Sequence, residues 1–191
     1  MTIFIEIFLT NSKNVSIILK HFADKSKNFQ YNMNAGGGIM ILREHYIQPI
    51  GEFYDSDLIK IITGIRRCGK SVILEQIKDE IKQKTDNIIY LNYEDKRDIA
   101  KVGSENELIE YVEKNRKEGL CYIFLDEFQV IKEWQEACKT LRLHNNSVFI
   151  TGSNSKILSK EFTKEFSGRY IAFKIRPFVY KEILEYTKKI K

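Results

Sequence analysis

The stretch Ile59-Lys-Ile-Ile-Thr63, followed by Gly64-Ile-Arg-Arg-Cys-Gly69-Lys70-Ser71, decides the fold of this chain. A short apolar run of β type leads directly into the spacing G-x-x-x-x-G-K-S. A polyphosphate needs several backbone N–H groups converging on it, so the chain must turn tightly and lie close to the ligand. Gly64 and Gly69 lack a Cβ and permit that approach. The stretch therefore predicts a phosphate-binding loop.

Each polar position of this loop has an expected role. Lys70 would place its ammonium among the β- and γ-phosphate oxygens, and the Ser71 hydroxyl would serve as a ligand of Mg²⁺. A helix starting near Lys70 would add the positive end of its dipole. For Arg66 and Arg67 we expect side chains that point outward, to salt bridges or partners. The predicted nucleotide-binding residues are Gly64, Ile65, Arg66, Arg67, Cys68, Gly69, Lys70, Ser71 and Val72.

Length and composition describe an ordinary globular protein. The 191 residues suffice for one α/β domain, and 43% of them are apolar. A net charge of +5 is mild, so contact with nucleic acid is permitted but only weakly supported. Three cysteines show no metal-ligand spacing, which favours packing roles and a reduced, cytoplasmic setting. The sequence predicts no transmembrane segment and no membrane partner.

Residues 1–39 differ from the rest, because they lack a sustained amphipathic period and carry three consecutive glycines, Gly36 to Gly38, near their end. We expect an N-terminal extension there, either disordered or a mis-called start, with the domain proper in residues 40–191. After a lead-in segment over 41–51, strand-type runs alternate with amphipathic helical patterns, which predicts a parallel sheet covered on both faces. The strands are expected at 59–63, 88–93, 121–125, 147–151 and 170–175, and a last helix from Val179.

Leu125-Asp126-Glu127 follows an apolar strand and supplies a second block of site residues. An aspartate at the carboxyl end of a buried strand can hold the Mg²⁺ that Ser71 contacts. Glu127 is the candidate general base, placed to deprotonate an attacking water. The alternative is an ordinary acidic turn into solvent.

Two further segments carry candidate catalytic residues. The run Thr151-Gly-Ser153-Asn154 ends the fourth strand, where one of these polar side chains could sense the γ-phosphate or position water. Which of the three does so stays open, as does a simple turn that caps the next helix. Arg169 precedes the fifth strand and is the candidate transition-state arginine, in its own subunit or in a neighbour's. A surface salt bridge is the alternative for Arg169.

Four blocks together resemble prokaryotic ATPases of the AAA type, within the additional-strand P-loop class. They are Ile62-Thr-Gly-Ile-Arg-Arg-Cys-Gly-Lys-Ser71, Phe124-Leu-Asp-Glu-Phe-Gln129, Phe149-Ile-Thr-Gly-Ser-Asn-Ser155, and Gly168-Arg169 with the later Pro177-Phe178 and Glu182. The resemblance implies an α/β three-layer P-loop NTPase sandwich with sheet order 5-1-4-3-2. It also implies ATP rather than GTP, since no N-K-x-D follows.

Relatives in this group usually continue into a second C-terminal domain, so the resemblance leads us to expect a truncated chain here. The leading interpretation is an Mg²⁺-dependent ATP-binding domain that hydrolyses ATP, in a homo-oligomer or with a protein partner. Two alternatives stay open. One is a nucleotide-gated switch or DNA-associated module with little hydrolysis, and the other is a P-loop small-molecule kinase.

Overall fold

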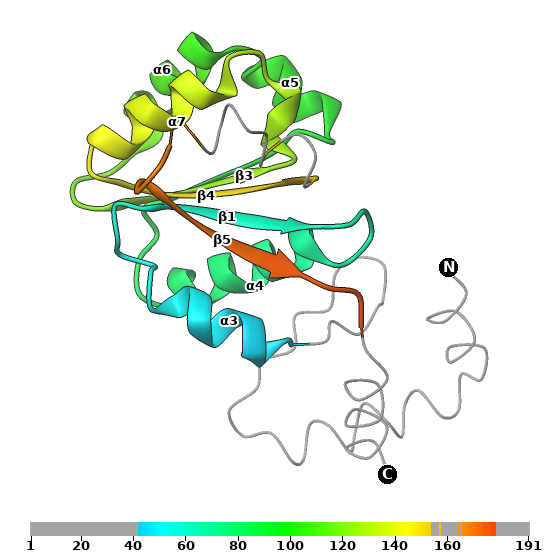
Figure 1. Cartoon of the computed structure of the whole chain (residues 1–191). Coiled ribbons are helices and arrows are strands. Elements are labelled where there is room, and N and C mark those ends of the chain that lie inside the picture. The colour runs from blue at the N-terminus through cyan, green and yellow to red at the C-terminus, as the bar shows by residue number, and fades with distance from the viewer. Residues whose placement is uncertain (1–41, 154–156, 158–163, 165, 179–191) are drawn as a thin grey trace, which may run out of the picture. The chain divides into compact units, whose positions relative to one another are not determined.

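The computed structural model describes residues 42–153, 157, 164 and 166–178 (Figure 1). Leu42–Pro177 forms one compact unit, which contains the helices and strands described below. The predictions for residues 1–39, for Asn154 and for a last helix from Val179 lie outside the described residues.

A five-stranded parallel sheet forms the centre of this unit, in the order β2-β3-β4-β1-β5 (Figure 1). This order confirms the predicted 5-1-4-3-2 arrangement and the α/β class. The inner strand β1, which lies between β4 and β5, is buried along its whole length, as expected for a parallel strand covered on both faces. The strands are β1 Ile59–Gly64, β2 Ile88–Asn92, β3 Cys121–Asp126, β4 Asn146–Ser153 and β5 Tyr170–Ile175.

Helices cover both faces of the sheet (Figure 1). On one face, Ile61, Leu125 and Ile150 belong to the core shared with α5, α6 and α7. On the other, Ile62, Phe124 and Phe149 pack in the core shared with α3 and α4. The alternation follows from the two-residue period of a strand. The helices are α3 Glu44–Gly51, α4 Lys70–Lys82, α5 Lys96–Lys101, α6 Glu105–Asn115 and α7 Trp134–Leu143.

Some local structure differs from the prediction. The lead-in segment contains α3, which was not predicted because Pro49 lies inside it and removes a helical hydrogen bond. Burial of Ile47 and Ile50 offsets that loss. The short helix α5 was also missed, since none of its residues is buried and it has no apolar face to detect. No described helix is long and apolar enough to cross a bilayer.

Because all strand pairs are parallel, the carboxyl ends of β1, β3 and β4 lie at one edge of the sheet. Gly64 pairs with Ser153, and Leu125 pairs with Ile150. The loop after β1, the acidic pair after β3 and the polar end of β4 therefore meet there, where ligands of parallel α/β sheets usually bind.

Candidate active site

The loop between β1 and α4 is closely packed at both of its glycines. A Cβ on Gly64 would lie 2.5 Å from the Sγ of Cys68 and 2.5 Å from the carbonyl oxygen of Ile175. Gly69 has φ of +93°, a left-handed conformation that glycine adopts without strain. The two glycines thus serve the tight turn predicted from the sequence.

The N-terminus of α4 is open toward this loop. No side chain among the described residues caps it, since its N-cap is Gly69. The N-terminus of α6, by contrast, is closed by a capping box in which Ser104 and Glu107 bond each other's backbone N–H groups. Free N–H groups and the helix dipole make an uncapped N-terminus suitable for an anion.

Lys70 connects the loop to the acidic pair after β3. Its side chain is only 5% exposed, and its Nζ lies 3.5 Å from Oε1 of Glu127. The structure thus brings together two blocks that are far apart in the sequence. The ammonium and the carboxylate face each other at the carboxyl edge of the sheet.

Thr151 joins Asp126 to Glu127. The Thr151 hydroxyl donates a hydrogen bond to Oδ1 of Asp126 and accepts one from the backbone N–H of Glu127 at 2.9 Å. Oδ2 of Asp126 is buried and has no hydrogen-bond partner among the described residues. A buried carboxylate oxygen without a partner is costly, which marks it as an atom that a ligand would satisfy.

The backbone of Glu127 is strained. Its φ of 51° and ψ of 39° are left-handed, which costs a non-glycine residue on the order of 1–3 kcal/mol. The hydrogen bond from its N–H to Thr151 helps to hold this conformation. Such outliers concentrate at functional sites, where the surrounding structure fixes them.

The remaining predicted residues lie around this centre. Ser71 is the second residue of α4 and is half-buried. Ser153 is the last residue of β4, next to Gly64 in β1. The side chains of Ile65, Arg66, Arg67 and Val72 are exposed, as expected for the two arginines.

Arg169 lies at the opposite edge of the sheet. It directly precedes β5, and its carbonyl accepts a hydrogen bond from the N–H of Ile59 at 3.1 Å. A strand of six residues, roughly 20 Å long, therefore separates Arg169 from the phosphate loop. Within one chain this placement does not bring Arg169 to the site, which leaves the neighbouring-subunit role and the surface salt bridge as the predictions for this residue.

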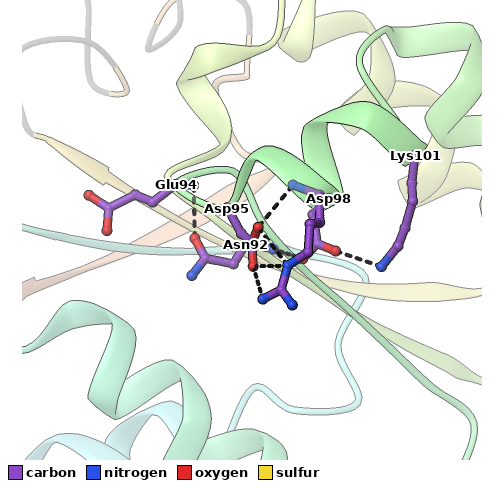
Figure 2. A network of polar contacts seen from close by, with 6 residues as sticks. Asn92, Glu94, Asp95, Asp98 and Lys101 are labelled. Carbon is purple, nitrogen blue, oxygen red and sulfur yellow. Dashed lines mark hydrogen bonds and ion pairs between the residues drawn. The ribbon is translucent and has the colours of Figure 1, made fainter.

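A second polar cluster lies at the carboxyl end of β2 (Figure 2). Asp98 accepts a hydrogen bond from the N–H of Asn92 at 3.0 Å and from Lys101 at 2.8 Å. Asp95 caps α5, and hydrogen bonds from the side chain and backbone of Arg97 lower the pKa of its carboxyl to about 2. These groups bond one another, so the cluster shapes the turn from β2 into α5.

Two residues near the site were missed at the level of sequence. The buried guanidinium of Arg43 donates to the carbonyl of Cys68 at 3.2 Å and thereby supports the loop. Gln129 donates from Nε2 to Oε2 of Glu127. Nothing in the sequence around Arg43 indicated a loop contact, whereas Gln129 follows the candidate base by two residues and had a positional signal.

The donor set fits a magnesium ion that is shared with a phosphate ligand. Among the described residues no group of three or more His, Cys, Asp or Glu could hold a metal alone. Mg²⁺ is commonly bound through one or two carboxylates together with substrate phosphates. Asp126, with its free Oδ2, provides one such carboxylate.

The cysteines are packing residues in this structure. Cys68, Cys121 and Cys138 are free and buried. Burial raises the pKa of the Cys121 thiol to about 11 and also raises the pKa of Cys138. Thiols with raised pKa values are poor nucleophiles.

The sequence model of a family described as "AAA domain" matches residues 56–184. An uncharacterised protein of Haemophilus influenzae is 39% identical over 151 residues, which are 76% of this chain and 38% of that protein. The uncharacterised protein MJ1544 of Methanocaldococcus jannaschii is 39% identical over 131 residues, 67% of this chain and 28% of its own length. The chain thus spans 38% or less of these two curated relatives.

Among solved structures, AMPPCP-bound DnaA from Aquifex aeolicus is similar to this chain with a TM-score of 0.54. The match covers 77% of this chain and 49% of DnaA at 18% identity. At this identity the likeness shows a shared fold alone.

Proposed function

The chain belongs to the AAA domain family of P-loop ATPases, and from this premise we propose that it binds ATP with Mg²⁺ and hydrolyses it. The contact of 3.5 Å between Lys70 and Glu127 carries the proposal, because it unites the phosphate loop with a candidate base. DnaA, on a similar fold, is bound to AMPPCP, an analogue of ATP, which supports the same ligand class here.

Binding follows from the loop. The triphosphate lies against the backbone N–H groups between Gly64 and Ser71, with the open end of α4 beneath it. Lys70 moves its ammonium from Glu127 to the β- and γ-phosphate oxygens, whose negative charge is the greater. The exposed Ile65 and Val72 and the outward Arg66 and Arg67 contribute backbone rather than side-chain contacts.

The metal site uses Ser71 and Asp126. The Ser71 hydroxyl and the unpaired Oδ2 of Asp126 are the oxygens that would hold Mg²⁺, directly or through water. When bound, the ion neutralises charge on the β- and γ-phosphates. Thr151 keeps the Asp126 carboxylate in place through its hydroxyl, so we assign Thr151 a positioning role. Ser153 and Asn154 stay candidates for the group that senses the γ-phosphate.

Hydrolysis uses Glu127 as the general base. The water oxygen bonds to the γ-phosphorus, and the bond from that phosphorus to the β,γ-bridging oxygen breaks. ADP leaves with the electron pair of that bond, and the water proton passes to the Glu127 carboxylate. Release of Lys70 to the phosphates frees Oε1 of Glu127 for this proton.

The test of the proposed function is Glu127→Gln in the 191-residue chain. We expect ATP binding to persist and kcat to fall by about 10²- to 10⁴-fold, the usual contribution of a general base. Calorimetry measures binding, and phosphate release without any added acceptor measures turnover, each with Mg²⁺ and with a chelator. A kinase would release little phosphate without an acceptor.

Glu133→Gln is the matched control. Glu133 also has a positive φ, of 58°, but it is exposed and pairs with Lys132 at 3.6 Å. Its substitution should leave binding and kcat unchanged. Unchanged turnover in Glu127→Gln, or no ATP binding by the unmodified chain, would contradict the proposed function.

Arg169 fits a role between subunits of a homo-oligomer. It is exposed and lies at the end of the strands opposite the loop, so the role we propose for it is contact with the γ-phosphate of a neighbouring subunit rather than with its own. Mixing Arg169→Ala with Lys70→Ala chains tests this, because mixed assemblies would contain one intact shared site. No recovery of turnover on mixing would contradict the shared site.

The free cysteines support a cytoplasmic location.

A further inference from the structure

The side chain of Gln129 holds one of the two oxygens of the candidate base. Gln129 lies in the 3₁₀ turn Phe128–Val130, directly after Glu127, and its Nε2 donates to Oε2 of Glu127. The other oxygen, Oε1, lies 3.5 Å from Nζ of Lys70. The two carboxylate oxygens thus have different partners, and this restricts rotation of the carboxylate.

Only one orientation of the Gln129 amide gives this contact. With its oxygen toward Glu127, two acceptors would face each other without a proton between them. In the orientation observed, Oε1 of Gln129 is buried and has no hydrogen-bond partner among the described residues. If the Gln129 side chain pointed outward, water could solvate both atoms of its amide. The inward position, which leaves Oε1 without a partner, is therefore explained by the hydrogen bond to the Glu127 carboxylate.

Gly152 provides the space for this amide. A Cβ at Gly152 would lie 2.8 Å from Cδ of Gln129 and would clash with its Oε1. Gly152 pairs with Thr63 of β1, so the amide rests on the strand beside the one that leads into the phosphate loop. The side chain of Ile157 also lies there, with its Cδ1 too close to the Cβ position, so the glycine in the run Thr151-Gly152-Ser153 is explained by Gln129 and Ile157 together.

We propose that Gln129 is a positioning residue that orients the Glu127 carboxylate toward the attacking water. This inference rests on the proposed function. Once Lys70 engages the phosphates, the Nε2 donor of Gln129 is the side-chain contact that keeps the carboxylate in place. Gln129 takes part in no bond change, because the water proton goes to Glu127 and the broken bond is the one to the β,γ-bridging oxygen.

The first experiment compares Gln129→Ala with Gln83→Ala in the full chain. Gln83 is exposed and directly follows α4, so its variant controls for the loss of a glutamine side chain. We expect Gln129→Ala to lower kcat by roughly 10- to 100-fold, the effect of a misplaced catalytic group, with ATP affinity unchanged. A residue that merely supported the fold would lower binding and kcat together.

Gln129→Glu is the second variant, and it separates hydrogen bonding from packing. The substitution is nearly isosteric, but at neutral pH it places two carboxylates against each other. We expect a kcat below that of Gln129→Ala at pH 8, and a rise relative to the unmodified chain as the pH falls. A protonated Glu at this position can donate an O–H where the amide donated an N–H.

Gly152→Ala is the third variant. The atoms that its Cβ would meet belong to the ends of flexible side chains, Gln129 and Ile157, so the chain can fold with Gln129 displaced. We expect the kcat of this variant to fall as in Gln129→Ala. Combining both substitutions should lower kcat little further, because each removes the same contact.

The outcomes separate the inference from the proposed function. If the unmodified chain hydrolyses ATP and Glu127→Gln does not, but Gln129→Ala and Gln129→Glu both keep the original kcat, the inference is wrong and the function stands. If Gln129→Ala loses ATP binding as well, or Gln129→Glu shows no pH-dependent recovery, the positioning role is also overturned. Absence of any ATP binding or turnover overturns both.

Discussion

Two buried lysines lie near opposite ends of the same strand and differ in what their ammonium groups face. Lys60 is the second residue of β1 and is 0% exposed. Lys70 begins α4, beyond the carboxyl end of β1, and is 5% exposed. Burial of a lysine is costly in either place. Burial alone therefore does not distinguish a lysine that supports the fold from one that binds a ligand.

The partners of Lys60 close its site. Its Nζ donates to the carbonyl of Ser56 at 2.8 Å and lies 4.8 Å from the centre of the Phe149 ring. Burial lowers the pKa of this ammonium to about 7, against the attraction of Asp55 and Asp57, which raises it. Every contact here is made by the folded chain itself.

The partners of Lys70 leave its site open to a ligand. The ammonium faces the Glu127 carboxylate at 3.5 Å, beside a loop of glycines and an uncapped helix. Asp126 at the same edge has an unpaired buried oxygen. What distinguishes the carboxyl ends of the strands is therefore the presence of unsatisfied polar groups and strained backbone around the charged side chain.

The largest expected effect contrasts Lys70→Ala with Lys60→Met. We expect Lys70→Ala to lower kcat/KM for ATP by about 10²- to 10³-fold, since it removes a charge that, in the proposed mechanism, stabilises the transferring phosphoryl group. Lys60→Met should leave kcat/KM unchanged, because Lys60 lies at the opposite end of β1 from the loop. Steady-state phosphate release measures both.

If the two variants behave alike, the two lysines do not differ in function as proposed. Equal losses of turnover would mean that both substitutions lower turnover by destabilising the folded chain. Thermal unfolding of each variant is the control, and Lys70→Ala should retain a cooperative transition.

The next effect concerns the pH dependence of stability at Lys60. An unfolded lysine keeps its proton up to about pH 10.4, whereas the folded Lys60 has a pKa of about 7. Between these values the unfolded chain binds the extra proton, so the free energy of unfolding rises with pH, by up to about 1.4 kcal/mol per unit. Below pH 7 both states are protonated and this contribution is constant. Urea unfolding at pH 7 to 9 should therefore show a smaller rise for Lys60→Met than for the unmodified chain.

Parallel pH profiles for the two proteins would show that Lys60 keeps its proton in the fold. The difference between the profiles is the relevant quantity, because other titrating groups contribute equally to both.

Much of the fold was predictable because its signals are local. The strand boundaries follow from apolar runs. The position of the phosphate loop follows from glycine spacing, since turn geometry depends on few residues. The helix α3 was not predictable in this way, because packing of Ile47 and Ile50 overrides the effect of Pro49.

For the candidate site, the sequence indicated residues that the structure brings together, but it did not indicate all of their contacts. Lys70, Asp126 and Glu127 were identified from their motifs, and the structure brings Lys70 and Glu127 together. The contact of Arg43 with the loop joins residues that are 25 positions apart. A side-chain contact between residues so far apart produces no periodic pattern in the sequence. The edge on which Arg169 lies depends on the direction of β5, which only the sheet topology fixes.

The smallest expected effect concerns the amino ends of the strands, which we expect to contribute to stability but not to turnover. The buried Ser147 hydroxyl donates to the carbonyl of Tyr54 at 2.5 Å, so Ser147→Ala leaves that carbonyl without this donor. We expect a loss of about 1 kcal/mol in the free energy of unfolding, with kcat unchanged, as a lost hydrogen bond far from the site would give. Ser167→Ala, at an exposed serine, is the control and should change stability by less than about 0.5 kcal/mol. Urea titration measures both, and a drop in kcat for Ser147→Ala would show that the two edges of the sheet are coupled.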